Sequence, residues 1–293
     1  MTTIIKNPKI ADYFCEVSYP DVLTKASGIA PLFEAGKFIL LRDYKLNLDF
    51  DFLNSVSFSE AQEVLDGRDI VRAQKLSYKY ILSLHPDKHI KNPVQRAIFE
   101  KCFNSNKKQL AYFQEQIFIG HQQILDLFKI LFPQYDCFDL NGTWRFTSTL
   151  FENLHWDNFP DLDDRHQTRI FVNIDKNPRI WHTSHPLEDY CQENYHQFNL
   201  AQFKDTNPND IINFMDRNVL GGMGNRCLDG WERHSIAFEQ GDIWLADSRL
   251  ISHQIYQGNR AAIYMFHIKP ESMHDPEMRF NRRIARLHQQ LSQ

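Results

Sequence analysis

Long apolar runs are missing from this sequence. No stretch approaches the ~18 uninterrupted apolar residues of a membrane-spanning helix, and the mean hydropathy is −0.49. The amino terminus, MTTIIKNPKIADYF, also lacks the basic start and apolar stretch of a secretory signal. We therefore expect no transmembrane segment and a cytoplasmic protein.

Cysteine and excess positive charge are scarce as well. The 5 cysteines are scattered along the chain, which argues against a disulfide framework and against a CxxC metal site. The 33 basic and 37 acidic residues give a formal charge of −4, so the chain lacks the overall charge of a nucleic-acid-binding protein. We expect no nucleic-acid partner.

The composition that is present belongs to a globular protein. Hydrophobic residues make up 42% of the 293 residues, and the 23 Phe, 11 Tyr and 5 Trp predict a core filled with aromatic rings. No repeat or Gly/Ser-rich linker divides the chain. We expect one domain over residues 1–293, with a helix-rich portion (1–140), a catalytic core (141–270) and a carboxyl-terminal helix (271–293).

The first portion shows helical spacing. Apolar residues recur every three or four positions from Pro93 to Phe132, which predicts one long helix or two helices broken near Gly120. A short strand is expected between Gly36 and Leu46, and Ser59 is expected to cap a helix. At the other end of the chain, Asp275 is expected to begin the closing helix.

After Gly142 the sequence pattern predicts short strands. TWRFTSTLF, QTRIFVNI, PRIWHT, DIWLADS and RAAIYMFHI are bounded by turn residues, and no helices alternate with them. This pattern indicates an antiparallel sandwich or barrel rather than a doubly wound sheet. The polar segment 183–225 is expected to form part of the substrate-binding wall.

The strongest chemical signal is NLHWDNFP, where His155 and Asp157 are two residues apart. On a strand such residues point to the same face, so an imidazole and a carboxylate can bind one metal ion from one side. His253, between two later predicted strands, is the best candidate for a third ligand. Two histidines and one carboxylate form the facial triad of non-haem Fe(II) oxygenases, which leaves positions open for a co-substrate and dioxygen.

A basic residue is needed if the co-substrate is 2-oxoglutarate, because a guanidinium binds a carboxylate through two charge-assisted hydrogen bonds. Arg260 follows His253 and begins the last predicted strand. Arg169 competes for the same role, and Arg145 is a third option. Asn173 is placed to reach the co-substrate from a neighbouring strand.

Together these segments resemble the Fe(II)/2-oxoglutarate-dependent dioxygenase superfamily and, within it, the Kdo hydroxylase family, which acts on the 3-deoxy-D-manno-octulosonic acid of lipopolysaccharide. Asn153 to Tyr190 is similar to that family's LHVDAFP segment, its RVFxNIN strand and the PRVWRxGEPFED continuation. Ser252 to Ile268 resembles the stretch with the second iron histidine, Ser272 to Met278 the closing helix, and Leu131 to Tyr135 also has a counterpart.

The resemblance implies a mostly β fold with flanking α-helices, a distorted double-stranded β-helix (jelly roll, cupin-like) with helices packed on one side. It implies an oxidoreductase in which His155, Asp157 and His253 are both the catalytic residues and the iron ligands. Fe(II), 2-oxoglutarate and dioxygen are the implied cofactors and co-substrates. The implied substrate is the Kdo sugar of a lipid A precursor, at the cytoplasmic face of the inner membrane.

Such a substrate suggests peripheral membrane attachment through the basic closing helix, which contains Arg279, Arg282, Arg283 and Arg286.

Three other interpretations stay open. The same chemistry also acts on protein side chains or small amino acids in other members of the superfamily, and a cupin-like protein can hold a metal without catalysis. His85-Pro86-Asp87, behind a basic amphipathic stretch, resembles the HPD loop of a J-domain and suggests a co-chaperone that engages an Hsp70.

Overall fold

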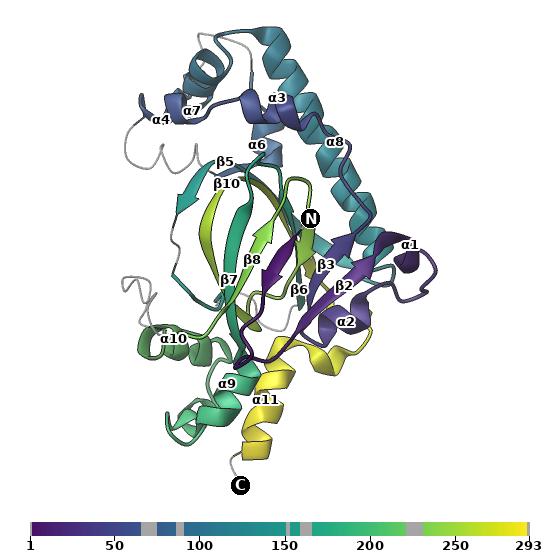
Figure 1. Ribbon diagram of the computed structural model, residues 1–293, viewed down its shortest axis with the longest axis vertical. Helices are drawn as coiled ribbons and strands as arrows, with labels where there is room; N and C mark the ends of the chain where they lie inside the picture. The colour runs from purple at the N-terminus through teal and green to yellow at the C-terminus, as the bar shows by residue number, and fades with distance from the viewer. Residues whose placement is uncertain are drawn as a thin grey trace.

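Two long antiparallel strands, β5 (Cys137–Leu150) and β10 (Ile251–Ile268), form the centre of a sheet (Figure 1). The computed structural model describes residues 2–65, 75–85, 91–150, 153–158, 166–220 and 231–291, and within them the sheet has ten strands. The main order is β1-β8-β7-β10-β6-β9-β3-β2, and β5 pairs with β10 and β4. The other strands are β1 (Thr3–Ile5), β2 (Phe14–Ser18), β3 (Phe38–Arg42), β4 (Lys75–Ser77), β6 (His166–Asn173), β7 (Arg179–Pro186), β8 (His234–Phe238) and β9 (Ile243–Leu245).

Strand β10 belongs to both halves of the sheet and curls it into a half-barrel. Its first part, from Ile251 to Gln257, pairs with β7, and its second part, from Ala261 to Ile268, pairs with β6. The register against β5 shifts between Gly258 and Arg260. A Cβ atom at Gly258 would collide with the Arg179 guanidinium, so a glycine is what lets β10 pass this close to β7.

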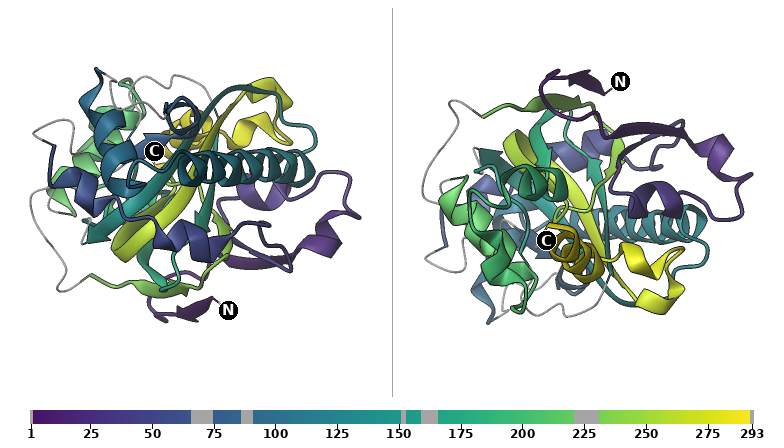
Figure 2. Two further views of the ribbon diagram at one scale, coloured as in Figure 1. Left: turned by 90° about the horizontal axis from the view of Figure 1, so that it is seen from above. Right: turned by 90° about the horizontal axis from the view of Figure 1, so that it is seen from below.

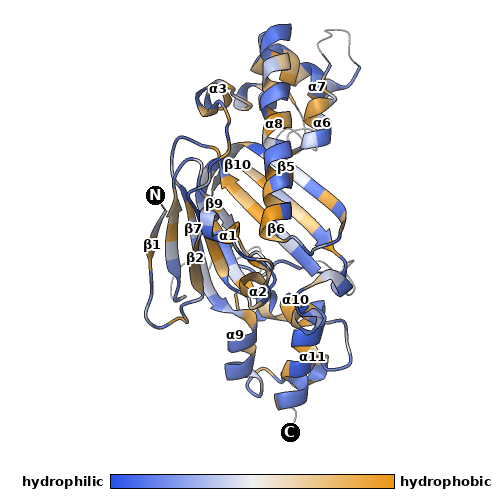
Figure 3. Cartoon of the chain, turned by 90° about the vertical axis from the view of Figure 1, so that its right-hand side faces the viewer, coloured by the Kyte–Doolittle hydropathy of each residue, from blue (hydrophilic) through white to orange (hydrophobic). Residues whose placement is uncertain are grey.

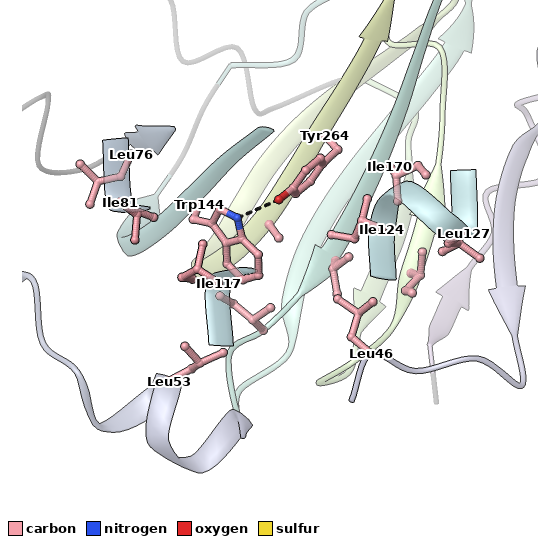
Figure 4. Close-up of a cluster of buried hydrophobic side chains, with 14 of the residues drawn as sticks. Leu46, Leu53, Leu76, Ile81, Ile117, Ile124, Leu127, Trp144, Ile170 and Tyr264 are labelled. Carbon is pink, nitrogen blue, oxygen red and sulfur yellow. Dashed lines mark hydrogen bonds between the residues drawn. The ribbon is translucent and has the colours of Figure 1, made fainter. Parts of the chain in front are cut away.

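Helix α8 (Lys107–Leu131) covers the outer face of the sheet (Figure 3). Its buried apolar residues, among them Ile117 and Ile124, recur at helical spacing and face the even-numbered side chains of β5 and β10. Trp144 and Tyr264 lie at the centre of this contact, where the indole N–H donates to the phenol oxygen at 3.1 Å (Figure 4).

The break in the long helical stretch is not where the sequence suggested. Helix α8 runs through Gly120 without interruption, so that prediction is wrong. The chain breaks earlier, at Asn104 and Ser105, which both have positive φ, and Asn106 then caps α8 through its side chain. Gly120 instead makes room for the ring of Trp144, since a Cβ atom there would lie 2.7 Å from Trp144 Cη2.

A second core lies inside the half-barrel and is aromatic, as the composition predicted. Phe238 stacks on Trp244 with ring centroids 3.7 Å apart, and Phe171 packs edge-on against Trp181 at 4.9 Å. Because β6 and β9 supply Phe171 and Trp244 while β7 and β8 supply Trp181 and Phe238, these contacts join the two halves of the sheet. The predicted mostly β architecture with flanking helices is confirmed.

Helices α9 (Leu187–Asn194), α10 (Asn209–Asn218) and α11 (Phe280–Leu291) gather at the end of the half-barrel opposite α3 (Phe50–Ser55) and α7 (Pro93–Ala97) (Figures 1 and 2). The closing helix begins at Phe280 rather than at Asp275, which caps only a 3₁₀ turn from Pro276 to Met278. Within the described residues, no helix is both long enough and apolar enough to cross a bilayer. The remaining helices are α1 (Tyr19–Val22), α2 (Ala30–Glu34), α3 (Phe50–Ser55), α4 (Ser59–Gln62), α6 (Tyr78–Leu82), α7 (Pro93–Ala97), a π-helix (Ile98–Cys102) and two 3₁₀ turns (Leu200–Phe203, Pro270–Ser272).

Candidate metal centre

The segment that contains His155 and Asp157 is held against β10 by main-chain hydrogen bonds. His155 and His253 form an antiparallel bridge, in which each N–H donates to the other residue's carbonyl, at 3.1 and 2.8 Å. The N–H of Asp157 donates to the carbonyl of Ser248 at 2.8 Å. These bonds fix the backbone on both sides of Trp156 and place all three predicted ligands beside one another.

The three side chains converge on one point. One ligand atom from each of His155, Asp157 and His253 can be chosen so that all lie within 4.8 Å of one another. The Nε2 atoms of the two imidazoles lie 3.5 Å and 3.8 Å from the two oxygens of the Asp157 carboxylate. This spacing leaves room for an ion between the three groups.

Both imidazoles are oriented by their second ring nitrogen. Nδ1 of His155 lies 2.6 Å from the carbonyl of Asn153, and Nδ1 of His253 lies 3.2 Å from the carbonyl of Ile251. A carbonyl only accepts, so Nδ1 carries the proton in each ring and Nε2 presents its lone pair to the centre. Carbonyl partners of this kind hold metal-binding histidines in a fixed orientation.

The charges at the centre also suit a cation. Burial opposes ionisation of Asp157, but the charge of the neighbouring Arg169 guanidinium holds the pKa of its carboxyl well below the usual range. Burial and the neighbouring His155 lower the pKa of His253 to about 4. At neutral pH the site therefore offers a carboxylate anion and a neutral imidazole, the forms that bind metal.

Two imidazole nitrogens and one carboxylate oxygen form the donor set that prefers iron in non-haem oxygenases, with several coordination positions left for other ligands. Trp181 lies flat against the His253 ring at a centroid distance of 5.4 Å and closes one side of the site. The residues present therefore fit an Fe(II) ion.

The centre opens into a cavity of about 1270 Å³, larger than many small-molecule sites. The inner face of β5, β6 and β10 forms one wall, and α10 forms part of the rim. The lining residues are Lys75, Asn141, Thr143, Arg145, Asn153, His155, Trp156, Asp157, Asn158, Arg169, Phe171, Trp181, Asn213, Asp216, Arg217, His253, Ile255, Ile263 and Met265.

Of the residues expected to bind a co-substrate, Arg169 and Arg145 line this cavity. Arg169 also forms an ion pair with the Asp157 carboxylate, which places its guanidinium beside the predicted ligands. A cation is therefore available next to the metal centre, as the sequence suggested.

Arg260 lies elsewhere, so its expected place in the site is wrong. Its guanidinium pairs with Asp175 at 3.4 Å and donates to the carbonyl of Val56 at 3.0 Å. The cause is strand alternation, because Ile263 and Met265 line the cavity and the even-numbered positions of this part of β10 face outward.

Asn173 does not reach the cavity either. Its amide donates to the carbonyls of Phe238 and Asn177, at 2.9 and 3.1 Å, and its side-chain oxygen accepts from the N–H of Asp175. Asn173 therefore builds the turn that follows β6.

Sequence reasoning did not single out Asp216, on α10. Its carboxylate accepts a hydrogen bond of 3.0 Å from the N–H of Trp156, the residue between two predicted ligands. Burial raises the pKa of Asp216 to about 6. Asn213 and Arg217 share its face of the helix and also line the cavity, in keeping with the expectation that segment 183–225 contributes to the substrate wall.

The J-domain-like tripeptide is described only at His85, which is exposed, and Pro86 and Asp87 lie outside the described residues.

Comparisons with known proteins establish the fold. No family profile and no curated protein sequence matches the chain. Among solved structures, it is similar to the apo form of the Kdo hydroxylase KdoO, a non-heme Fe(II) alphaketoglutarate dependent dioxygenase, with a TM-score of 0.62 and 16% identity over 96% of each chain. The cobalt(II) complex of KdoO matches with a TM-score of 0.62 and 15% identity, over 93% of this chain and 94% of KdoO.

A KdoO complex with alphaketoglutarate and Fe(III) matches with a TM-score of 0.60 and 15% identity, over 92% of this chain and 94% of KdoO. The resemblance found in the sequence is thus confirmed for the fold.

Proposed function

We propose that this protein is an Fe(II)- and 2-oxoglutarate-dependent hydroxylase. The observation that carries the proposal is the convergence of His155, Asp157 and His253 inside a large cavity. A cupin-like protein that only holds a metal needs neither such a cavity nor a cation beside the ligands. The fold shared with KdoO adds support.

In the proposed site His155, Asp157 and His253 hold the iron. When bound, iron supplies the activation of dioxygen that couples decarboxylation of 2-oxoglutarate to hydroxylation of the substrate. Arg169 holds the distal carboxylate of 2-oxoglutarate by charge-assisted hydrogen bonds. Arg169 also pairs with the Asp157 carboxylate, which places its guanidinium beside the proposed iron ligands. Trp181 and Phe171 line the site with apolar rings and exclude water.

For the substrate we propose an acidic sugar, with the Kdo sugar of a lipid A precursor first. Among the described residues, four cationic side chains line the cavity, against two carboxylates. A lining of this kind favours anions, and Asn213 and Asp216 provide hydrogen-bonding groups for sugar hydroxyls. We propose that the enzyme works in the cytoplasm at the surface of the inner membrane.

Peripheral contact through α11 can involve only part of its basic face. Arg282 and Arg286 are exposed, but Arg283 is buried in an ion pair with Glu188. The apolar face of α11, which includes Ile284 and Leu287, packs into the inner core and cannot enter a bilayer. Attachment would therefore be electrostatic, and binding to anionic vesicles should disappear at high salt.

Anaerobic titration with Fe(II) and 2-oxoglutarate tests the proposal, because chelation of this co-substrate by Fe(II) gives a weak visible charge-transfer band. The unaltered protein should develop the band, and Asp157→Ala should abolish it. Arg169→Gln should raise the 2-oxoglutarate concentration needed for half-formation, whereas the matched Arg260→Gln should leave it unchanged. Absence of the band in the folded, unaltered protein would contradict the proposed function.

A further inference from the structure

Gln167 lies behind Arg169 on strand β6. The two residues are two positions apart, so their side chains point to the same face of the strand. Arg169 lines the cavity, whereas Gln167 is 2% exposed and does not belong to the lining. Gln167 therefore acts on a molecule in the cavity only through its neighbours.

The side-chain amide of Gln167 contacts the guanidinium of Arg169. A guanidinium only donates hydrogen bonds, so the amide is oriented with its oxygen towards it. In this orientation the oxygen accepts from Nε of Arg169 at 2.6 Å and from Nη2 at 3.3 Å. Both donors lie on the same edge of the planar fork. Hydrogen bonds from a charged donor are among the stronger ones in proteins, so this contact restrains the guanidinium.

Two further contacts hold other parts of the guanidinium. Nη1 pairs with the Asp157 carboxylate. Nη2 lies 3.8 Å from Sδ of Met265, the residue directly opposite Arg169 on β10. Contacts on different sides of the fork fix its position and its plane, so the Arg169 side chain is oriented before a ligand binds.

The backbone that carries Gln167 and Arg169 is also fixed. The register of β6 against β10 is continuous from His166 to Asn173, with Gln167 opposite His267. Side chains on a regular strand keep their relative positions more precisely than side chains on a loop. The strand therefore presents the Gln167 oxygen to the guanidinium at a constant place.

The orientation of an arginine affects how tightly it binds a carboxylate. A mobile arginine side chain loses rotamer freedom when it binds, and this loss reduces the affinity. A carboxylate also makes its two hydrogen bonds best in the plane of the fork. Removal of the Gln167 oxygen would leave Nε without this acceptor and would restore rotation of the guanidinium.

We infer that Gln167 is a positioning residue for 2-oxoglutarate, which orients the Arg169 guanidinium for the distal carboxylate without touching the co-substrate. The inference rests on the proposed function, because that proposal assigns the distal carboxylate to Arg169. It adds the residue that prepares Arg169 for this role.

The test measures the 2-oxoglutarate concentration at which half of the charge-transfer band has formed, anaerobically and with Fe(II). Gln167→Met keeps the length of the side chain and removes the acceptor. This variant should raise the concentration roughly ten- to hundredfold, as loss of a hydrogen bond to a charged group does.

Two comparisons separate positioning from a general structural defect. 2-Oxobutanoate has the same chelating groups but no distal carboxylate, so its half-formation concentration should not change in Gln167→Met. In an Arg169→Gln background, the same substitution should not weaken 2-oxoglutarate further, because the group that it orients is absent. Gln116→Met is the matched control, since it removes a buried amide oxygen that accepts from the N–H of Asp49 at 2.7 Å, and it should leave both concentrations unchanged.

A measurement on the metal-free protein tests the contact itself. The Nε–H of Arg169 is identified in an NMR spectrum of labelled side-chain nitrogens by its loss in Arg169→Gln. It should exchange slowly with solvent in the unaltered protein and faster in Gln167→Met. Thermal unfolding shows whether Gln167→Met is folded, and Gln167→Leu replaces it if it is not.

Three results would overturn the inference. The first is a 2-oxoglutarate concentration that is unchanged or lower in Gln167→Met. The second is equal weakening of 2-oxoglutarate and 2-oxobutanoate. The third is rapid exchange of the Arg169 Nε–H in the unaltered protein, which needs no variant at Gln167. Failure of the proposed function has a different signature, because no band then forms even in the unaltered protein.

Discussion

Protonation of His166 should limit the stability of the protein in mild acid. The ring is buried at the start of β6, where Phe33 packs edge-on against it and the Tyr135 hydroxyl lies 3.4 Å from Nε2. Burial lowers the pKa of His166 from 6.5 to about 4. The folded protein therefore resists a proton that the unfolded chain accepts, and stability is lost as the pH falls from 6.5 towards 4.

The size of the effect follows from linkage. A shift of this size corresponds to about 3 kcal/mol over the whole window, and about 2 kcal/mol of it is lost between pH 7 and pH 5. His166→Phe keeps an aromatic ring and removes the titrating group. The free energy of unfolding of the unaltered protein, relative to this variant, should fall by about 2 kcal/mol between the two pH values.

Urea unfolding of both proteins at pH 7 and pH 5 measures this difference. Other histidines also have lowered pKa values, but they are present in both proteins and cancel in the comparison. A difference between the two proteins that stays the same at both pH values would refute the reasoning.

Three further changes test the core and the metal centre. Gly120→Ala should lower the free energy of unfolding by about 1–3 kcal/mol despite better helix propensity, because the new Cβ atom meets Trp144. Gln122→Ala, at an exposed position of the same helix, should not lower it, and equal thermal midpoints of the two variants would contradict this prediction. Asp216→Ala should destabilise the protein by about 1–3 kcal/mol and weaken Fe(II) binding, because the N–H of Trp156 loses its acceptor. Asp216→Asn keeps an acceptor and should have smaller effects on both stability and Fe(II) binding, and identical effects of the two variants would contradict this prediction. Fe(II) at a hundredfold excess over its Kd should raise stability by about 2.7 kcal/mol until a chelator is added, and should not stabilise Asp157→Ala.

The proposed ligands were accessible from the sequence because their signal is local. His155 and Asp157 are two residues apart, and this spacing alone puts them on one face of an extended segment. His253 was predicted as the third ligand because it lies between two later predicted strands. Their convergence depends on a bridge between two distant segments, which no local pattern contains.

The errors have equally definite causes. Arg260 is seven positions after His253, and an odd spacing already puts a residue on the other face of a strand. Gly120 looked like a helix break, but its small size serves the contact with Trp144. Asp216 gave no signal, because its role depends on α10 meeting the Trp156 main chain.

The course of β10 has a consequence for which atom of its substrate such an enzyme would oxidise. The first part of β10 carries His253. The second part of the same strand pairs with the strands that carry Arg145 and Arg169. The distance between the metal centre and the part of β10 beside Arg145 and Arg169 is therefore set by the curvature of one continuous strand. The distance between the bound end of the substrate and the metal centre would then be fixed. This distance would determine which carbon of the substrate is oxidised.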